Sequence, residues 1–148
     1  MQISSHPTDA IANLANEQTQ RRSPLPLIGF YILAVLFNLC LTVQLMTVGL
    51  AQFYNPTWWH IHVLFVRGYS GITFILLAWV YWIDVPKRVR ILTVILPILL
   101  ALQFLTIRIH TPLPLAIAHP LIGFSLFSVS TTLVHRVWRT IANKNESN

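Results

Sequence analysis

The stretch LIGFYILAVLFNLCLTVQLMTVGL, Leu27–Leu50, decides the fold of this 148-residue chain. It contains no charged side chain, and no Asp, Glu, Lys or Arg occurs anywhere from Ser23 to Val66. About 20 consecutive apolar residues are enough for a helix to cross the hydrocarbon core of a bilayer. The stretch therefore predicts a transmembrane helix.

Three further apolar segments of similar length follow. The predicted spans are residues 27–50, 61–83, 91–109 and 113–134. Only 9% of the residues are charged, against about 25% in a soluble domain. Short connections make consecutive helices antiparallel neighbours. The sequence predicts an all-α fold: a polytopic membrane four-helix bundle, up-down-up-down, over residues 25–138. Residues 1–24 are predicted to be a cytoplasmic tail and residues 139–148 a disordered cytoplasmic tail. Spans one and two form a first predicted hairpin and spans three and four a second, and their residues show no evident internal repeat.

The Lys and Arg residues indicate the orientation of the bundle. Basic residues concentrate in the cytoplasmic loops of membrane proteins. Both termini are therefore predicted to be cytoplasmic. The net charge of +6 does not indicate a nucleic-acid partner, because the basic residues lie at the ends of the predicted spans and not along one docking face. Eight of the ten basic residues fall on the predicted cytoplasmic side: Arg21, Arg22, Lys87, Arg88, Arg90, Arg136, Arg139 and Lys144.

Familiar catalytic patterns are absent from the sequence. No Asp or Glu lies within a predicted span, and there is no H-E-x-x-H, nucleophile elbow or phosphate-binding glycine loop. The single Cys40 can form no internal disulfide. The sequence therefore argues against hydrolase or kinase chemistry, and we expect no enzyme.

Histidines provide the candidate binding site. Four of the six lie near the predicted outer face, and His62 and His119 are the deeper ones, in spans two and four. Histidine is the commonest metal-binding side chain, and a glycine one turn after His119 leaves room for a flat ring. Heme b is a candidate cofactor, with His62 and His119 as its iron ligands. Arg67 and Arg108 would then provide counter-charge for propionates or for another anion or quinone oxygen.

Three short motifs carry a resemblance to a known family. They are Leu41–Gln44, the Pro56–Trp59 segment followed by His62, and Ala118–Pro120. Over residues 28–138 the chain resembles a family of small uncharacterised bacterial four-helix membrane proteins from cyanobacteria and actinobacteria. The resemblance implies the fold and no established activity. In that family a Trp-Trp-x-x-His element opens span two and a His-Pro element opens span four, and a glycine follows the first histidine by one turn, where this chain has Val66.

Three functions stay open from the sequence. The first is a non-catalytic accessory or assembly subunit of a membrane complex. The second is a b-type heme or quinone-binding redox protein that uses the outer histidines, and the third is a small transporter. The expected partners are the lipid bilayer and other membrane subunits or further copies of the chain. The expected location is a bacterial plasma membrane or a cyanobacterial thylakoid.

Overall fold

A computed structural model describes residues 25–109 and 117–146, and every regular element in them is helical. This confirms the predicted all-α class. The helices are α2 (Leu25–Phe53), α3 (Trp58–Tyr69), α4 (Gly71–Trp79), α5 (Lys87–Arg108) and α6 (Ala118–Glu146).

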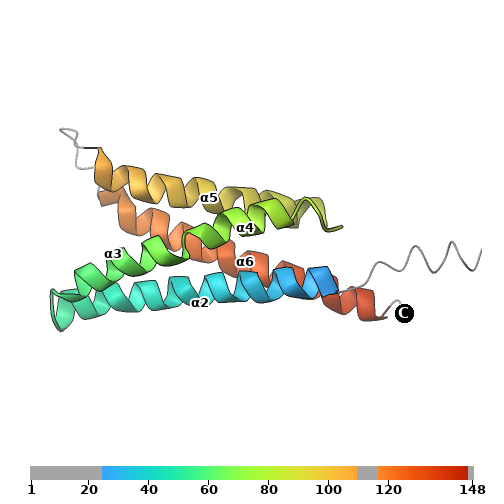
Figure 1. The fold of residues 1–148 in the computed structure, drawn as a ribbon, viewed down its shortest axis with the longest axis horizontal. Helices are drawn as coiled ribbons and strands as arrows, with labels where there is room; N and C mark the ends of the chain where they lie inside the picture. Colours follow the sequence, from blue (N-terminus) through green and yellow to red (C-terminus); the bar gives the residue numbers. More distant parts are fainter. Residues whose placement is uncertain (1–24, 110–116, 147–148) are drawn as a thin grey trace, which may run out of the picture.

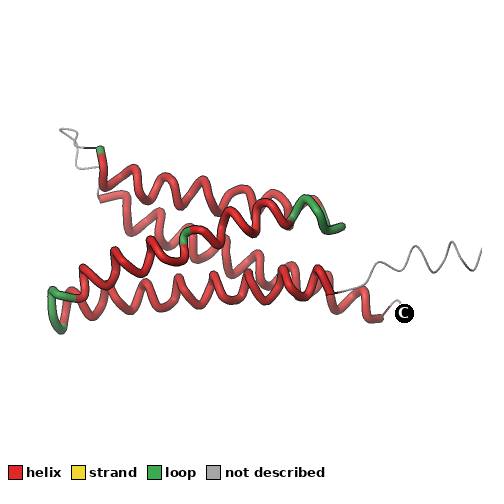
Figure 2. The backbone as a smooth tube through the Cα atoms, in the orientation of Figure 1, coloured by secondary structure: helices red, strands yellow, loops and turns green. Residues whose placement is uncertain are grey.

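The helices form an elongated bundle in which α2 begins and α6 ends at the same end (Figure 1). The tube in Figure 2 shows α3 and α4 following one another with a short break at Ser70. Helix α2 packs against α3, α4 and α6, and α5 packs against α4 and α6. Within the described residues α3 packs against neither α5 nor α6. We call the end that holds residues 54–57 the turn end, and the opposite end, which holds residue 84, the Asp84 end.

Three helical segments are long and apolar enough to cross a membrane: Leu25–Phe53, Trp58–Trp79 and Lys87–Arg108. The fourth helix, α6, has the length but carries more polar side chains, so its assignment as a span stays a prediction. It also continues to Glu146, past the predicted end of span four at residue 134 and into the predicted disordered tail. The predicted tail 1–24 and the start of predicted span four lie outside the described residues.

The pattern of buried residues shows a similarity between two hairpins, the first formed by α2 with α3 and α4 and the second by α5 with α6. The residue types alone do not show this similarity. Buried positions of α2 recur in α5 at a constant spacing of 59, and those of α3 and α4 recur in α6 at a spacing of 57. Because α2 packs on α6 as α5 packs on α4, the bundle consists of two hairpins with similar burial and packing. The matched buried pairs are Phe30 and Val89, Ala34 and Thr93, Phe37 and Leu96, Leu41 and Leu100, then Tyr69 and Leu126, Thr73 and Ser130, Leu76 and Leu133, Val80 and Val137.

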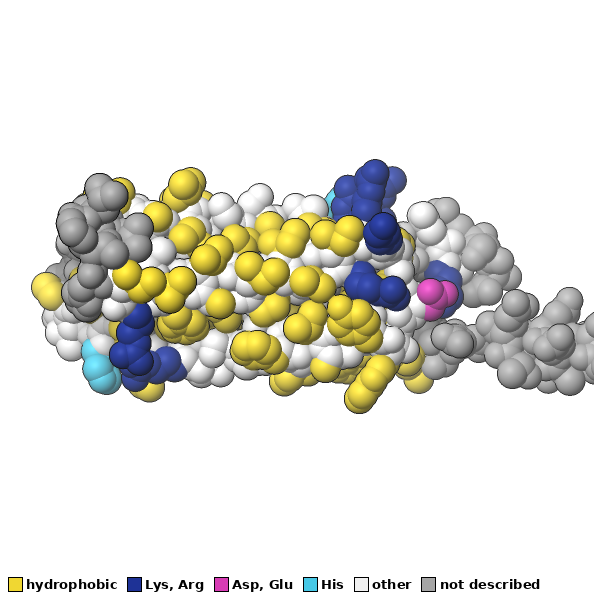
Figure 3. All heavy atoms as spheres, turned by 90° about the horizontal axis from the view of Figure 1, so that it is seen from above, with side chains coloured by type: hydrophobic (Ala, Val, Ile, Leu, Met, Phe, Trp, Pro, Cys, Tyr) yellow, Lys and Arg dark blue, Asp and Glu magenta, His cyan; other side chains and the backbone are white. Residues whose placement is uncertain are grey.

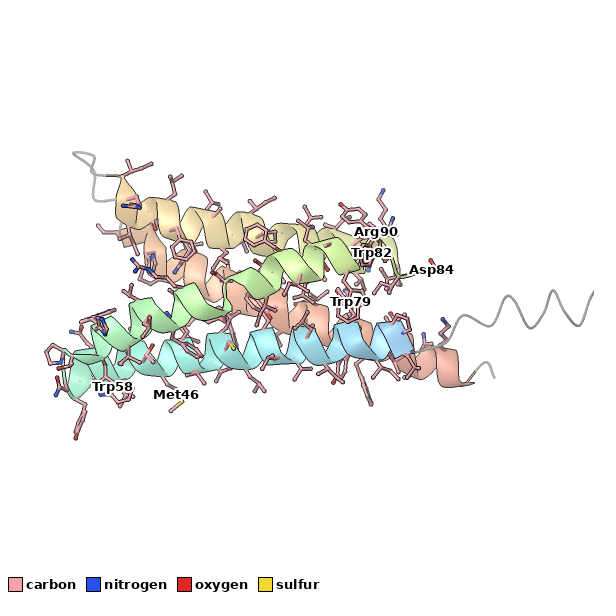
Figure 4. All side chains as sticks on the ribbon, viewed as in Figure 1. Met46, Trp58, Trp79, Trp82, Asp84 and Arg90 are labelled. Carbon is pink, nitrogen blue, oxygen red and sulfur yellow. The ribbon has the colours of Figure 1, made fainter. Side chains whose placement is uncertain are left out.

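Tight apolar packing fills the half of the bundle toward the Asp84 end. Leu76, Leu96 and Leu133 are almost fully buried there. Trp79 lies against α2 (Figure 4), and a Cβ on Gly29 would stand 3.1 Å from its indole carbons. A glycine at position 29 therefore lets the two helices approach around this ring.

Polar side chains in the middle of the bundle find partners inside it. The Asn38 side-chain amide donates to Ser130 Oγ at 3.2 Å and to Thr131 Oγ1 at 3.0 Å, which links α2 to α6. Hydroxyls of Ser125 and Thr132 on α6 instead donate to carbonyls of their own helix. Outward-facing side chains form an apolar band with Lys and Arg at both ends (Figure 3), as expected of a surface in lipid.

Equivalent positions in the two hairpins should contribute equally to stability. We expect Leu76→Ala and Leu133→Ala each to lower the free energy of unfolding by about 2–5 kcal/mol, because each leaves a cavity in close packing. Leu121→Ala is the matched control, since Leu121 is 70% exposed, and it should change little. The measurement is far-UV circular dichroism during denaturation by SDS in mixed micelles. Equal effects of all three substitutions would contradict the described core.

Candidate functional site

The turn end of the bundle contains a cavity of about 930 Å³. It exists because α3 does not close against α5 and α6 there, and α2, α3, α5 and α6 all contribute to its wall. Most of the lining side chains are apolar, with a few polar groups among them. Size and composition are those of sites for small molecules and cofactors.

All four site residues predicted from the sequence line this one cavity. His62 and Arg67 come from α3, Arg108 from the end of α5 and His119 from the start of α6. The structure therefore brings together residues that are up to 57 positions apart in the chain. Of the other outer histidines, His60 is exposed and does not line the cavity, and residue 110 lies outside the described residues.

Helix α2 fixes the ring of His62 from behind. The Gln44 side-chain nitrogen Nε2 lies 2.9 Å from His62 Nδ1 and 3.0 Å from the His62 backbone oxygen. Thr47 Oγ1 lies 3.1 Å from the same Nδ1 and donates to the Gln44 carbonyl at 2.7 Å. Trp59 adds an edge-to-face contact with the imidazole, with the ring centroids 5.6 Å apart. The ring is thus held through Nδ1, which leaves Nε2 for a ligand.

Helix α5 fixes the ring of His119 in a similar way. His119 Nδ1 lies 3.1 Å from the Gln103 backbone oxygen and 3.3 Å from Thr106 Oγ1. Thr106 Oγ1 also donates to the Gln103 carbonyl, at 2.9 Å. This ring is again held through Nδ1.

The two histidines share a motif that the sequence reading missed. Each is held by a Gln-x-x-Thr unit on the preceding helix, Gln44–Thr47 for His62 and Gln103–Thr106 for His119. The two units follow the spacing of 59 that relates α2 to α5, and the two histidines follow the spacing of 57. The signal that could have revealed the motif is the similarity of LTVQLMTV (residues 41–48) to LALQFLTI (residues 100–107).

Each unit also contains a buried amide oxygen that lacks a partner. Gln44 Oε1 and Gln103 Oε1 accept no hydrogen bond from any described group. An unsatisfied buried acceptor costs about 1–3 kcal/mol. Such atoms are rare in native proteins, and each one calls for an explanation, such as a role in function. Both glutamines line the cavity, which makes them part of the candidate site.

The electrostatics of the cavity are positive. Arg67 follows His62 by five residues, about 7.5 Å further along the helix, and Arg108 closes the wall from α5. The sequence has no Asp or Glu between Glu17 and Asp84. Asp84 itself lies far from the turn end, as the positions of Asp84 and Trp58 in Figure 4 show. A charged residue within a membrane span is a functional candidate, and this pair favours a ligand with negative or electron-rich oxygens.

Shape and ligand count restrict what the cavity can hold. Aromatic side chains of Phe104, Phe124 and Phe127 contribute to its wall. Gly123 lies one turn after His119, and a Cβ there would come within 3.3 Å of Gln103 Nε2. Within residues 25–109 and 117–146, no three His, Cys, Asp or Glu side chains are grouped as ligands for a bare metal ion. The two histidines instead provide the pair that heme iron uses, since the porphyrin supplies its other ligands.

Comparison with known proteins gives one similarity. The model of a family of unknown function, DUF6220, matches residues 44–109. The matched segment begins at Gln44, includes His62 and Gln103, and ends before His119. Neither the curated proteins nor the solved structures give a match. The chain is thus similar to an uncharacterised family over a segment that contains most of the cavity's polar residues.

Cysteine labelling should separate cavity from core. In a Cys40→Ser background, we expect Gln103→Cys to react readily with a membrane-permeable maleimide, because position 103 lines the cavity. Leu96→Cys, two turns away on α5, should react far more slowly, because position 96 is fully buried. The rates are read by mass spectrometry in mild detergent micelles. Equal rates at the two positions would show that the turn end is not open as described.

Proposed function

We propose that this small membrane protein is an accessory subunit that binds heme b in the cavity, where His62 and His119 would hold its iron. The observation that carries this proposal is the convergence of the two histidines on one apolar cavity from separate hairpins. Each ring is held through Nδ1. A bound heme would give the protein one-electron redox chemistry.

The residues present fit a heme in three respects. Metal-binding histidines usually donate their second ring N–H to a carbonyl or carboxylate, and His119 has the Gln103 carbonyl in that position. Phe104, Phe124 and Phe127 offer an apolar wall to a porphyrin. The space predicted beside Gly123 for a flat ring is instead occupied by the Gln103 side chain. Arg67 and Arg108 supply positive charge for two propionates. His62 fits after one change in its surroundings, which concerns Gln44.

Binding is better supported than transport. The half of the bundle toward the Asp84 end is packed with buried apolar side chains such as Leu76, Val80 and Val137. A transporter needs polar groups that continue across the membrane, whereas the polar groups of this cavity gather at the turn end. This arrangement favours a bound cofactor over a passing substrate.

A quinone is the second candidate ligand, and one observation favours it. As placed, His62 Nδ1 faces an N–H donor, the Gln44 amide, whereas His119 Nδ1 faces an acceptor, the Gln103 carbonyl. The free Nε2 atoms would then be a donor at His62 and an acceptor at His119. Such a pair can bind a ring with oxygens at opposite edges. The spectrum described next separates the two candidates.

Purified protein expressed with heme available should show a Soret band and, on reduction, an α band of a low-spin b-type heme. We expect His62→Ala and His119→Ala each to abolish the low-spin spectrum, because each removes one axial ligand. His60→Ala and His135→Ala are the matched controls and should leave it unchanged, since neither residue lines the cavity. The measurement is a reduced-minus-oxidised spectrum in mild detergent.

A colourless wild-type protein would rule out heme. If the same protein then quenched its tryptophan fluorescence on titration with a short-chain quinone, with Trp59 in the cavity wall as reporter, the second candidate would replace the first.

We also propose that both termini face the cytoplasm of a bacterium, in the plasma or a thylakoid membrane, with the cavity on the outer side. The cation distribution supports this orientation. Fusions of a reporter that fluoresces only in the cytoplasm should therefore be active at either end of the chain. A fusion in the turn at residues 54–57 should be silent. Fluorescence from that turn, or from one terminus alone, would contradict the orientation.

A further inference from the structure

We infer that Gln44 holds His62 in the tautomer that is unable to bind iron, so that heme is bound first by His119 and then by His62 once the Gln44 amide moves away from the ring. The inference rests on the proposed heme site. It assigns the two similar histidines different roles, and it makes Gln44 a positioning residue.

The donor at His62 is identified by a second contact. Gln44 Nε2 lies 3.0 Å from the His62 backbone oxygen, which can only accept. The atom there is therefore the amide nitrogen and not the amide oxygen. The same nitrogen lies 2.9 Å from His62 Nδ1. Its two hydrogens serve these two acceptors, so Nδ1 carries a lone pair and the proton of the neutral ring is on Nε2.

His119 has the opposite arrangement. Its Nδ1 faces the Gln103 backbone oxygen at 3.1 Å, and a carbonyl oxygen can only accept, so this Nδ1 carries the proton. The Nε2 of His119 therefore has its lone pair available. Because a backbone carbonyl sets this tautomer, the side chain of Gln103 has no part in it. His119 is prepared for iron and His62 is not.

Moving the Gln44 amide away from the ring would prepare His62 as well. A simple half-turn of the amide does not achieve this, because it would place Oε1 3.0 Å from the His62 backbone oxygen, and both atoms can only accept. Once the amide nitrogen has moved away, the proton of the neutral ring leaves Nε2 and is taken up at Nδ1. Thr47 Oγ1 lies 3.1 Å from Nδ1 and can accept there, because its own hydrogen is donated to the Gln44 carbonyl. The ring remains neutral, and the Nε2 lone pair becomes free for iron.

The tautomers can be tested without heme. In the apoprotein with ¹⁵N-labelled histidine, in micelles near neutral pH, the His62 signals should show the proton on Nε2 and the His119 signals the proton on Nδ1. His62→Ala and His119→Ala identify the two sets of signals. Gln44→Glu offers only acceptor oxygens when ionised and should move the His62 proton to Nδ1. Gln52→Glu adds the same charge at an exposed position outside the cavity, and as the matched control it should leave both tautomers unchanged. The same tautomer at both histidines of the wild type would overturn the inference.

The order of ligation can be tested by mixing hemin with the apoprotein and following the spectrum in time. The wild type should pass from a high-spin species with one histidine to a low-spin species with two. Gln44→Leu removes the hydrogen bond that must break, worth about 1 kcal/mol, and should speed the second phase roughly five- to tenfold. Thr42→Val is the matched control on the same helix, at an exposed position outside the cavity whose hydroxyl donates to its own helix, and it should leave the second phase unchanged. Circular dichroism checks that each variant is folded.

The outcomes separate the two proposals. Failure of the folded wild type to take up hemin at all would overturn the proposed heme function. Uptake with a second phase that is equally fast in the wild type and in Gln44→Leu would overturn the role of Gln44 alone.

Discussion

In a bilayer, a polar side chain that no water can reach must find its partners inside the protein, and the rest of this structure depends on that constraint. An unpaired polar group in hydrocarbon costs several kcal/mol. In the middle of the bundle the Asn38 side chain satisfies this constraint by donating hydrogen bonds to two hydroxyls of α6. At the turn end the same requirement produces the two Gln-x-x-Thr units. In each, the threonine hydroxyl donates to a carbonyl of its own helix and its oxygen lies within 3.3 Å of a histidine Nδ1 on the next helix. Side-chain bonding between helices thus concentrates where the cavity lies.

The sequence predicted the helical class and the existence of the spans because apolar runs of this length have few other uses. It also predicted that His62, His119, Arg67 and Arg108 belong together, since all four lie near the predicted outer face and the two histidines are the deeper ones there. Helix ends were less predictable. Helix α6 extends to Glu146, because its polar C-terminal turns continue the helix past residue 134, where the apolar stretch ends. The pairing of each histidine with a glutamine on the helix before it needed the structure, because it depends on how the hairpins close.

The similarity of the hairpins escaped the sequence for a physical reason. Core positions of a membrane bundle tolerate exchange between apolar residues of different shape, such as Phe30 and Val89, or even Ala34 and Thr93. The two hairpins share the positions of their buried residues, but the residue types at these positions differ, so the sequence shows the similarity poorly. The Gln-x-x-Thr units are kept in residue type as well, although only Gln44 contacts its histidine through the side chain, whereas Gln103 uses its backbone carbonyl. The polar residues therefore record the relationship between the hairpins better than the core does.

Departures from this similarity are what create the site. The correspondence between the hairpins relates the α2–α6 pair to the pair that α5 forms with α3 and α4, yet of these two helices only α4 packs on α5. The α3 half, beyond the break at Ser70, diverges and leaves the cavity between itself and α5. The residues differ at the same place: Val66 on α3 corresponds to Gly123 on α6, and Arg67 has Phe124 as its counterpart. A planar ligand would therefore meet Gly123, with the Gln103 side chain against it, on the α6 side and a cation on the α3 side. Two equal halves would offer the same surface twice, whereas this arrangement gives a bound ring a defined orientation.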